Sequence, residues 1–104
     1  ATADAQAQDP VTRGRQLVSD LGCVACHASD QKRTVGPGWG GVAGHEVRLT
    51  DGTTVTADEA YLVRSIRQPD AQIVADYPPH VMPSYDALID EADMKAIVAY
   101  LRSL

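Results

Sequence analysis

The five residues that most constrain this chain are Cys23, Val24, Ala25, Cys26 and His27, because they hold both of its cysteines. Two residues separate the cysteines, so the thiols lie about one helical turn apart, and the imidazole of the adjacent histidine projects from the same side. A disulfide between the pair would close a very short loop and would stabilise a folded chain very little. With 104 residues the chain has room for one domain, so this motif belongs to a single small fold.

The Cys-x-x-Cys-His spacing is the pattern by which proteins attach haem covalently. Each thiol can bond one vinyl group of the porphyrin, while His27 offers a ring nitrogen to the iron. A thioredoxin-like redox pair would need a βαβ context, which the sequence lacks. A structural zinc site would need four ligands, and one distant histidine added to these three residues is not a usual spacing. The motif therefore predicts haem c, an iron cofactor attached through Cys23 and Cys26.

The amino-acid composition suggests that a haem fills part of the hydrophobic core. Aromatic residues make up 5% of the chain, with Trp39, four tyrosines and no phenylalanine, so something other than large side chains is expected to fill the interior. Acidic residues outnumber basic ones by 14 to 9, which disfavours nucleic acid and anionic membrane surfaces as partners. No apolar run approaches the roughly 18 residues of a membrane helix. Residues 1–9 are predicted to be a flexible N-terminal tether before a domain over residues 10–104.

Local signals predict two helices in the first two thirds of the domain. Asp9 followed by a proline is a good helix start, and apolar residues recur at helical spacing over residues 10–22. Thr56 and Glu59 form a capping-box pattern that opens a second helix, which should stop before Pro69.

The remaining segments are predicted to be a glycine-rich loop, a hairpin, an extended stretch and a last helix. Residues 28–46 carry five of the eight glycines and form the loop. Asp51 and Gly52 are a two-residue hairpin signal between alternating apolar positions. Residues 69–85 are proline-rich and extended, and Asp90 is expected to cap the C-terminal helix.

The sequence resembles the class I c-type cytochrome family over residues 10–104. The shared features are Gly14 nine residues before the first cysteine, the CVACH motif, Gly36-Pro37, Met82-Pro83 and a last helix that ends in VAYLRSL. The resemblance implies a mainly α cytochrome c fold, with three to five short helices wrapped around a covalently bound haem and a small β-hairpin. It also implies that the first and last helices cross at Gly14, against an aromatic residue that we expect to be Tyr100.

His27 would fill one axial position of the iron, and another side chain must fill the second. The candidates are Met82, Met94, His45 and His80. Met94 lies in register with the apolar face of the last helix, which favours a core role, and His45 at the foot of the hairpin favours an exposed one. Met82 precedes a proline that fixes the chain, and its separation from His27 matches the family pattern. Met82 is therefore the expected ligand, and His80 is its rival.

The resemblance also implies roles near the haem. The carbonyl of Pro37 would accept a hydrogen bond from His27, and Trp39 would line the haem edge, although partial burial in the glycine-rich loop is the other interpretation. Many relatives carry arginine at the position of His45, near a haem propionate, so the chain departs from the pattern there. Ligation by His27 and Met82 leaves no open position on the iron. The chain is therefore expected to carry electrons and not to be an enzyme on its own.

A finer resemblance concerns the stretches EVRLTDGTTVTADEAYL and DYPPHVMPSY. Both are similar to the cytochrome c domain fused to subunit II of some bacterial haem–copper cytochrome c oxidases. This implies electron relay from an upstream donor, a quinol-oxidising complex or a small redox protein, to the copper-bearing domain of subunit II. The expected location is the periplasm, at the outer face of the cytoplasmic membrane, with membrane attachment only through the parent subunit.

Three other functions compete with this reading of the sequence. A free periplasmic cytochrome c would shuttle between a quinol-oxidising complex and a terminal oxidase or reductase. An enzyme with five-coordinate haem, such as a peroxidase, is disfavoured by Met82. A haem-based sensor would need a displaceable ligand and a signalling partner.

Overall fold

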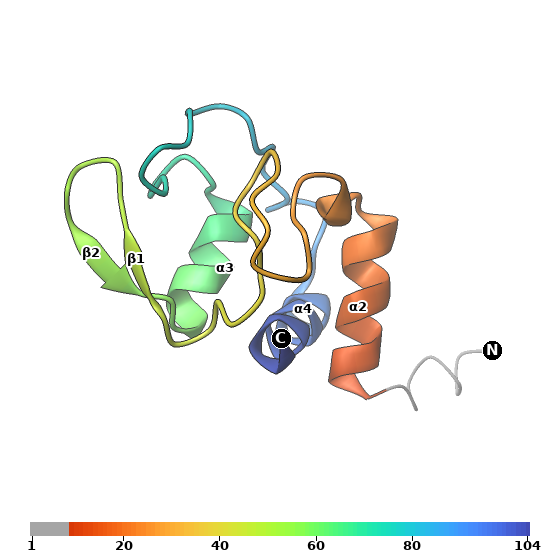
Figure 1. Cartoon of the computed structure of the whole chain (residues 1–104). Coiled ribbons are helices and arrows are strands. Elements are labelled where there is room, and N and C mark those ends of the chain that lie inside the picture. Colours follow the sequence, from red (N-terminus) through yellow and green to blue (C-terminus); the bar gives the residue numbers. More distant parts are fainter. Residues whose placement is uncertain (1–8) are drawn as a thin grey trace.

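A computed structural model describes residues 9–104, in which three α-helices frame long loops (Figure 1). In chain order the elements are α2 (Pro10–Asp20), the single 3-10 turn η1 (Cys23–Ala25), β1 (Glu46–Arg48), β2 (Thr54–Thr56), α3 (Glu59–Arg67) and α4 (Glu91–Ser103). Helix α4 packs against both α2 and α3, and the hairpin lies beyond α3 (Figure 1). The predicted mainly α fold with a small hairpin is confirmed. Residues 1–8 of the predicted tether lie outside the described residues.

The first and last helices begin at the predicted aspartate caps. Oδ1 of Asp9 accepts a hydrogen bond from the backbone N–H of Thr12 at 2.9 Å, and this bond lowers the pKa of the Asp9 carboxyl. Asp90 caps α4 in the same way at 2.8 Å. Helix α2 ends at Asp20, two residues before the predicted end, because Gly22 turns the chain with a left-handed φ of 80°.

The capping box predicted for α3 is wrong. Asp58 is the N-cap, and its Oδ1 accepts a hydrogen bond from the backbone N–H of Tyr61 at 2.8 Å. Thr56 is instead the last residue of β2, where it pairs with Glu46. The carboxylate of Asp58 also carries the negative charge that a helix N-terminus favours.

The hairpin is confirmed, but its turn is one residue longer than predicted. Strands β1 and β2 pair antiparallel, with Val47 opposite Val55. The backbone N–H of Leu49 donates to the carbonyl of Thr53 at 2.8 Å, so three residues form the loop. Gly52 closes it with a φ of 87°, which is the left-handed position of a three-residue hairpin loop.

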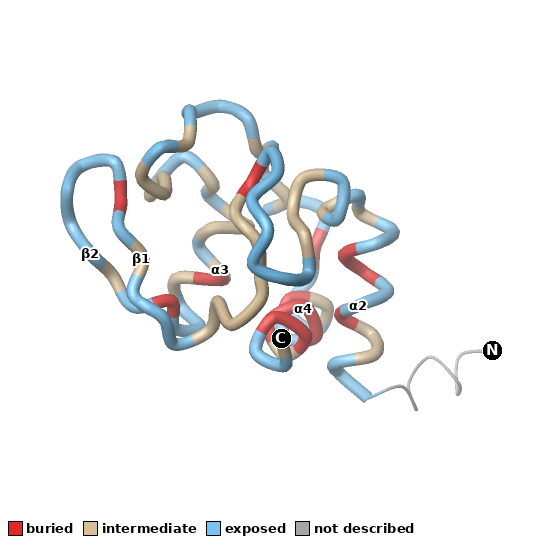
Figure 2. Tube along the Cα trace, viewed as in Figure 1, coloured by how far each residue is buried: buried red, intermediate tan, exposed pale blue. Residues whose placement is uncertain are grey.

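The core forms where α2 crosses α4. A Cβ placed on Gly14 would overlap the carbonyl oxygen of Ala96 and would lie 2.8 Å from the Cβ of Tyr100, so the two backbones approach as closely as a glycine allows. The predicted crossing of Gly14 against Tyr100 is thus confirmed. Buried residues gather on the facing sides of the helices (Figure 2). The central cluster is Leu17, Val18, Leu62, Ile89, Met94, Ala96, Ile97, Val98, Tyr100 and Leu101.

We predict that Gly14→Ala destabilises the haem-loaded protein. The added methyl group must push α2 away from α4, which costs about 2 kcal/mol of unfolding free energy even after the better helix propensity of alanine is counted. Urea unfolding followed by circular dichroism measures the loss. Ser19→Ala, an exposed change in the same helix, is the control and should shift the midpoint little. Equal stability of the two variants would contradict the close crossing.

Candidate functional site

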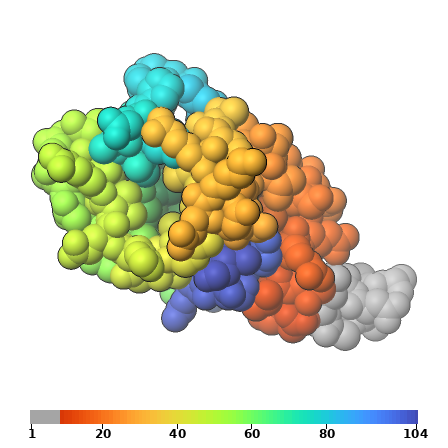
Figure 3. Space-filling view, viewed as in Figure 1, coloured from red at the N-terminus to blue at the C-terminus, as the bar shows by residue number. Residues whose placement is uncertain are grey.

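A cavity of about 670 Å³ opens beside the helical core. Its walls come from η1, the glycine-rich loop, β1, α3 and residues 69–85, and its floor includes the core residues Val18, Leu62, Ile97 and Leu101. The surface is hollowed where the glycine-rich loop, the hairpin and the segment after α3 meet (Figure 3). A mainly apolar cavity of this size is typical of a cofactor site.

Both cysteines line this cavity from a single helical turn. The backbone N–H groups of Cys26 and His27 both donate to the carbonyl of Cys23, at 3.2 and 3.1 Å. Each cysteine is half-buried and carries a free thiol. Burial raises the pKa of the Cys23 thiol, and the neighbouring Cys26 adds to the effect. The turn therefore presents two thiols to one cavity.

The imidazole of His27 is fixed in one orientation. Its Nδ1 donates a hydrogen bond to the carbonyl oxygen of Pro37 at 2.8 Å, the contact expected from the family. Because a carbonyl only accepts, Nδ1 carries the proton and Nε2 keeps a lone pair for a metal. A Cβ on Gly36 would come within 2.6 Å of Cε1 of the ring, so only glycine lets the loop pass this close.

Trp39 lines the cavity and connects the histidine to the helical core. Its ring stacks on His27 with 5.0 Å between centroids and 14° between planes. It also makes a perpendicular, edge-type contact with the ring of Tyr100, with 6.3 Å between centroids. The partly buried indole therefore supports His27 from within the glycine-rich loop.

Met82 also lines the cavity, on the segment that follows α3, and is partly buried there. Two contacts hold the chain after it. The hydroxyl of Ser84 donates to the carbonyl of Arg67 at 2.7 Å, and the backbone N–H of Tyr85 donates to the carbonyl of Ile66 at 3.3 Å. The segment with Met82 is thus attached to the end of α3.

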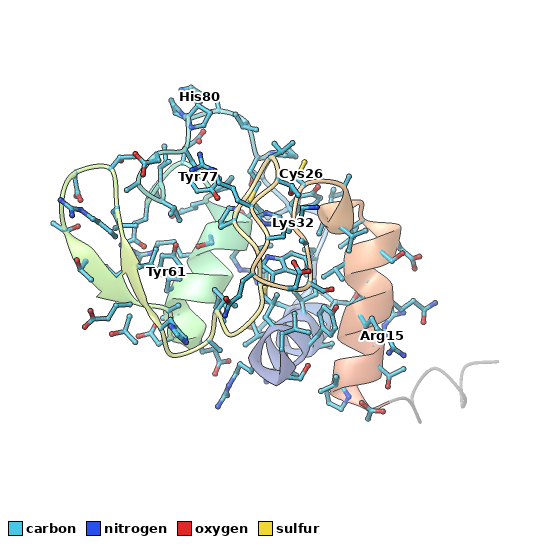
Figure 4. All side chains as sticks on the ribbon, viewed as in Figure 1. Arg15, Cys26, Lys32, Tyr61, Tyr77 and His80 are labelled. Atoms are coloured by element: carbon cyan, nitrogen blue, oxygen red, sulfur yellow. The ribbon has the colours of Figure 1, made fainter. Side chains whose placement is uncertain are left out.

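The other candidate ligands lie in different surroundings. The side chain of His80 is 82% exposed and points outward at the edge of the molecule (Figure 4), where its Nδ1 lies 2.9 Å from Oδ2 of Asp70. Met94 is 3% exposed in the core, as predicted. His45 is exposed at the cavity rim.

Sequence reasoning missed several residues of the cavity wall. Tyr61, Tyr77 and Tyr85 all line it, so three of the four tyrosines supply aromatic surface that the composition made scarce. Arg33 supports this wall without lining the cavity: its guanidinium donates to the carbonyl of Asp76 at 2.8 Å and lies 4.3 Å from the centroid of the Tyr77 ring. Because aromatic residues are scarce, the tyrosines could have been predicted to line the cavity. No local sequence pattern predicts the contacts of Arg33.

These residues fit a covalently attached haem. The cavity offers apolar walls, two thiols on one helical turn and an imidazole whose Nε2 lone pair is available, which is the donor set that haem c needs. Haem would be held by thioether bonds from Cys23 and Cys26 and by apolar contact with the walls.

We predict that acid–acetone extraction leaves haem on the wild-type polypeptide. Replacement of both Cys23 and Cys26 by alanine removes the thioether bonds, so any haem that this variant binds should extract completely. Haem staining of denaturing gels and the pyridine haemochrome spectrum measure the outcome. Release of intact haem from the wild type would contradict covalent attachment.

Comparison with known proteins identifies the family. Residues 11–104 match the cytochrome c family. No curated protein matches. Cytochrome cH from Methylobacterium extorquens has a similar structure, with a TM-score of 0.66 and 25% sequence identity, over 90% of this chain and 98% of that one. Within residues 9–104, none of the helices has the length and apolar character needed to cross a membrane.

The family match extends across almost all of the described residues, and it agrees with the fold and with the donor set of the cavity. Electron transfer by a c-type haem is the activity of this family. The chain belongs to the cytochrome c family, and it carries haem c attached through Cys23 and Cys26.

Proposed function

We propose that His27 and Met82 are the axial ligands of the haem iron, and that the domain relays single electrons to the copper centre of a terminal cytochrome c oxidase. One observation carries the ligand assignment: His27 and Met82 both line the cavity, whereas the rival His80 points into solvent. Met94 is excluded by its place in the core.

The surroundings of the two ligands suit electron transfer. Haem c, when bound, supplies an iron that changes its charge by one electron. The Pro37 carbonyl holds His27 with Nε2 directed away from the hydrogen bond, and the thioether of Met82 favours a higher reduction potential than a second nitrogen ligand would. With both positions filled by the protein, oxygen and peroxide have no site to bind. The apolar walls exclude water, so little solvent must reorganise when the charge changes.

The placement in an oxidase is supported by the finer resemblance to oxidase domains of two stretches that line the same cavity. The hairpin stretch, residues 46–62, is joined to residues 73–75, which lead directly into the ligand stretch, residues 76–85. Leu49 forms an isolated antiparallel bridge with Val74, and the backbone N–H of Ala75 donates to the carbonyl of Arg48 at 2.8 Å. Residues of both stretches line the same cavity, so the two stretches belong to one structural unit around the haem site.

In this proposal the partners are an upstream electron donor and the copper-bearing domain of oxidase subunit II. The domain would act in the periplasm, at the outer face of the cytoplasmic membrane, and would be held there by the parent subunit. The alternative is a free periplasmic cytochrome c. Its haem site would be the same, so only attachment to a larger chain distinguishes the two.

We predict that Met82→Ala opens the sixth position of the iron. The weak absorption band at the red end of the spectrum that marks a methionine–iron bond should disappear, the reduction potential should fall, and carbon monoxide and azide should bind. His80→Ala, which removes an exposed ring but keeps the backbone N–H that donates to Asp70, should keep the band and bind neither. The reverse pattern would make His80 the ligand.

We further predict that the native gene product is much larger than the 11.1 kDa of this chain and stays with the membrane fraction. Attachment makes transfer to copper intramolecular, with an effective concentration that can reach the mM range. The rate of that step should therefore be independent of dilution and only weakly dependent on salt. Haem staining of membrane and soluble fractions is the first measurement. A single soluble band near 11 kDa would favour the free carrier.

A further inference from the structure

We propose that Asp70 is a positioning residue for Met82, because its carboxylate holds His80 in a left-handed backbone conformation two residues before the ligand. The inference rests on the function proposed above, in which Met82 binds the iron. It concerns a residue outside the cysteine–histidine motif and outside the ligand pair.

One carboxylate contacts both the backbone and the side chain of the same residue. Oδ1 of Asp70 accepts a hydrogen bond from the backbone N–H of His80 at 2.9 Å, and Oδ2 lies 2.9 Å from its Nδ1. His80 has a φ of 63°, a conformation that non-glycine residues adopt only at an energetic cost. The contacts from Asp70 offset that cost and keep the chain in this bend.

The bend fixes one end of a short strap, residues 80–84, with Met82 at its centre. The other end is held by Ser84, whose hydroxyl donates to the carbonyl of Arg67 at the end of α3. Asp70 lies in the turn after the same helix, where the backbone N–H of Ala71 donates to the carbonyl of Gln68 at 3.0 Å. Both ends of the strap are therefore attached to the C-terminal end of α3, and α3 packs on the core.

The backbone hydrogen bond matters more than the ion pair. The two side chains are 82% and 43% exposed, so water and salt weaken the attraction between a carboxylate and a protonated imidazole. The bond to the backbone N–H needs only an oxygen acceptor at position 70, and an asparagine amide also supplies one. A graded series of substitutions can thus separate the positioning role from charge alone.

The experiment compares haem-loaded Asp70→Ala and Asp70→Asn with the wild type. In Asp70→Ala the strap loosens, so azide should bind about three- to tenfold more tightly, the methionine–iron band should weaken, and the amide of His80 should exchange hydrogen faster. Asp70→Asn should stay within about twofold of the wild type, since it keeps an acceptor. Asp20→Ala, which removes an exposed aspartate from the end of α2, is the matched control and should change none of the three.

A double variant tests the cause. Adding His80→Gly to Asp70→Ala removes the cost of the left-handed conformation, because glycine adopts it freely, so the band and the azide affinity should return towards wild-type values. Unchanged azide binding in Asp70→Ala would overturn the inference. So would a methionine–iron band that weakens equally in Asp70→Asn and Asp70→Ala and does not recover in the double variant. A wild type without the methionine–iron band would instead overturn the proposed ligand.

Discussion

The close crossing of α2 and α4 is the contact on which the haem site depends. Gly14 lets the helices touch through their backbones, and this approach places Tyr100 at the crossing. Tyr100 meets the edge of Trp39, and Trp39 stacks on the ring of His27. A continuous line of contacts therefore runs from the helix crossing to His27, the proposed iron ligand. The orientation of the imidazole is a consequence of core packing as well as of its hydrogen bond to Pro37.

The helices could be predicted because their signals are local. Asp9 and Asp90 each act on an N–H only three residues away, so a short stretch of sequence contains both partners. The prediction of the first residue of α3 was wrong because Thr56 and Asp58 are both good N-caps. The choice between them depends on the pairing of Thr56 with Glu46 in the hairpin. The predicted length of the hairpin loop was wrong for a similar reason, because the register of the two strands decides how many residues the loop contains.

The cavity could be predicted only in part. The thiols of Cys23 and Cys26 must lie one turn apart to reach the same porphyrin, so their chemistry is visible as spacing. The contacts of Arg33 with Asp76, and of Tyr85 with the carbonyl of Leu21, join residues 43 and 64 positions apart. No periodicity or motif marks such pairs. Polar residues scattered along the sequence become neighbours only when the long loops fold over the haem.

The helix crossing beside His27 and the wall that carries Met82 are stabilised by different kinds of interaction, so the two sides of the site differ in stability. The crossing of α2 and α4 buries apolar side chains such as Val18 and Ile97, which are 1% and 2% exposed. The wall with Met82 depends instead on partly exposed polar contacts, among them those of Arg33 and Ser84. Hydrogen bonds that water can replace contribute about 1 kcal/mol each, so this wall opens at a lower free energy than the whole domain unfolds. With Met82 as the proposed ligand, the wall would govern the access of external ligands to the iron, while the helices govern the stability of the fold.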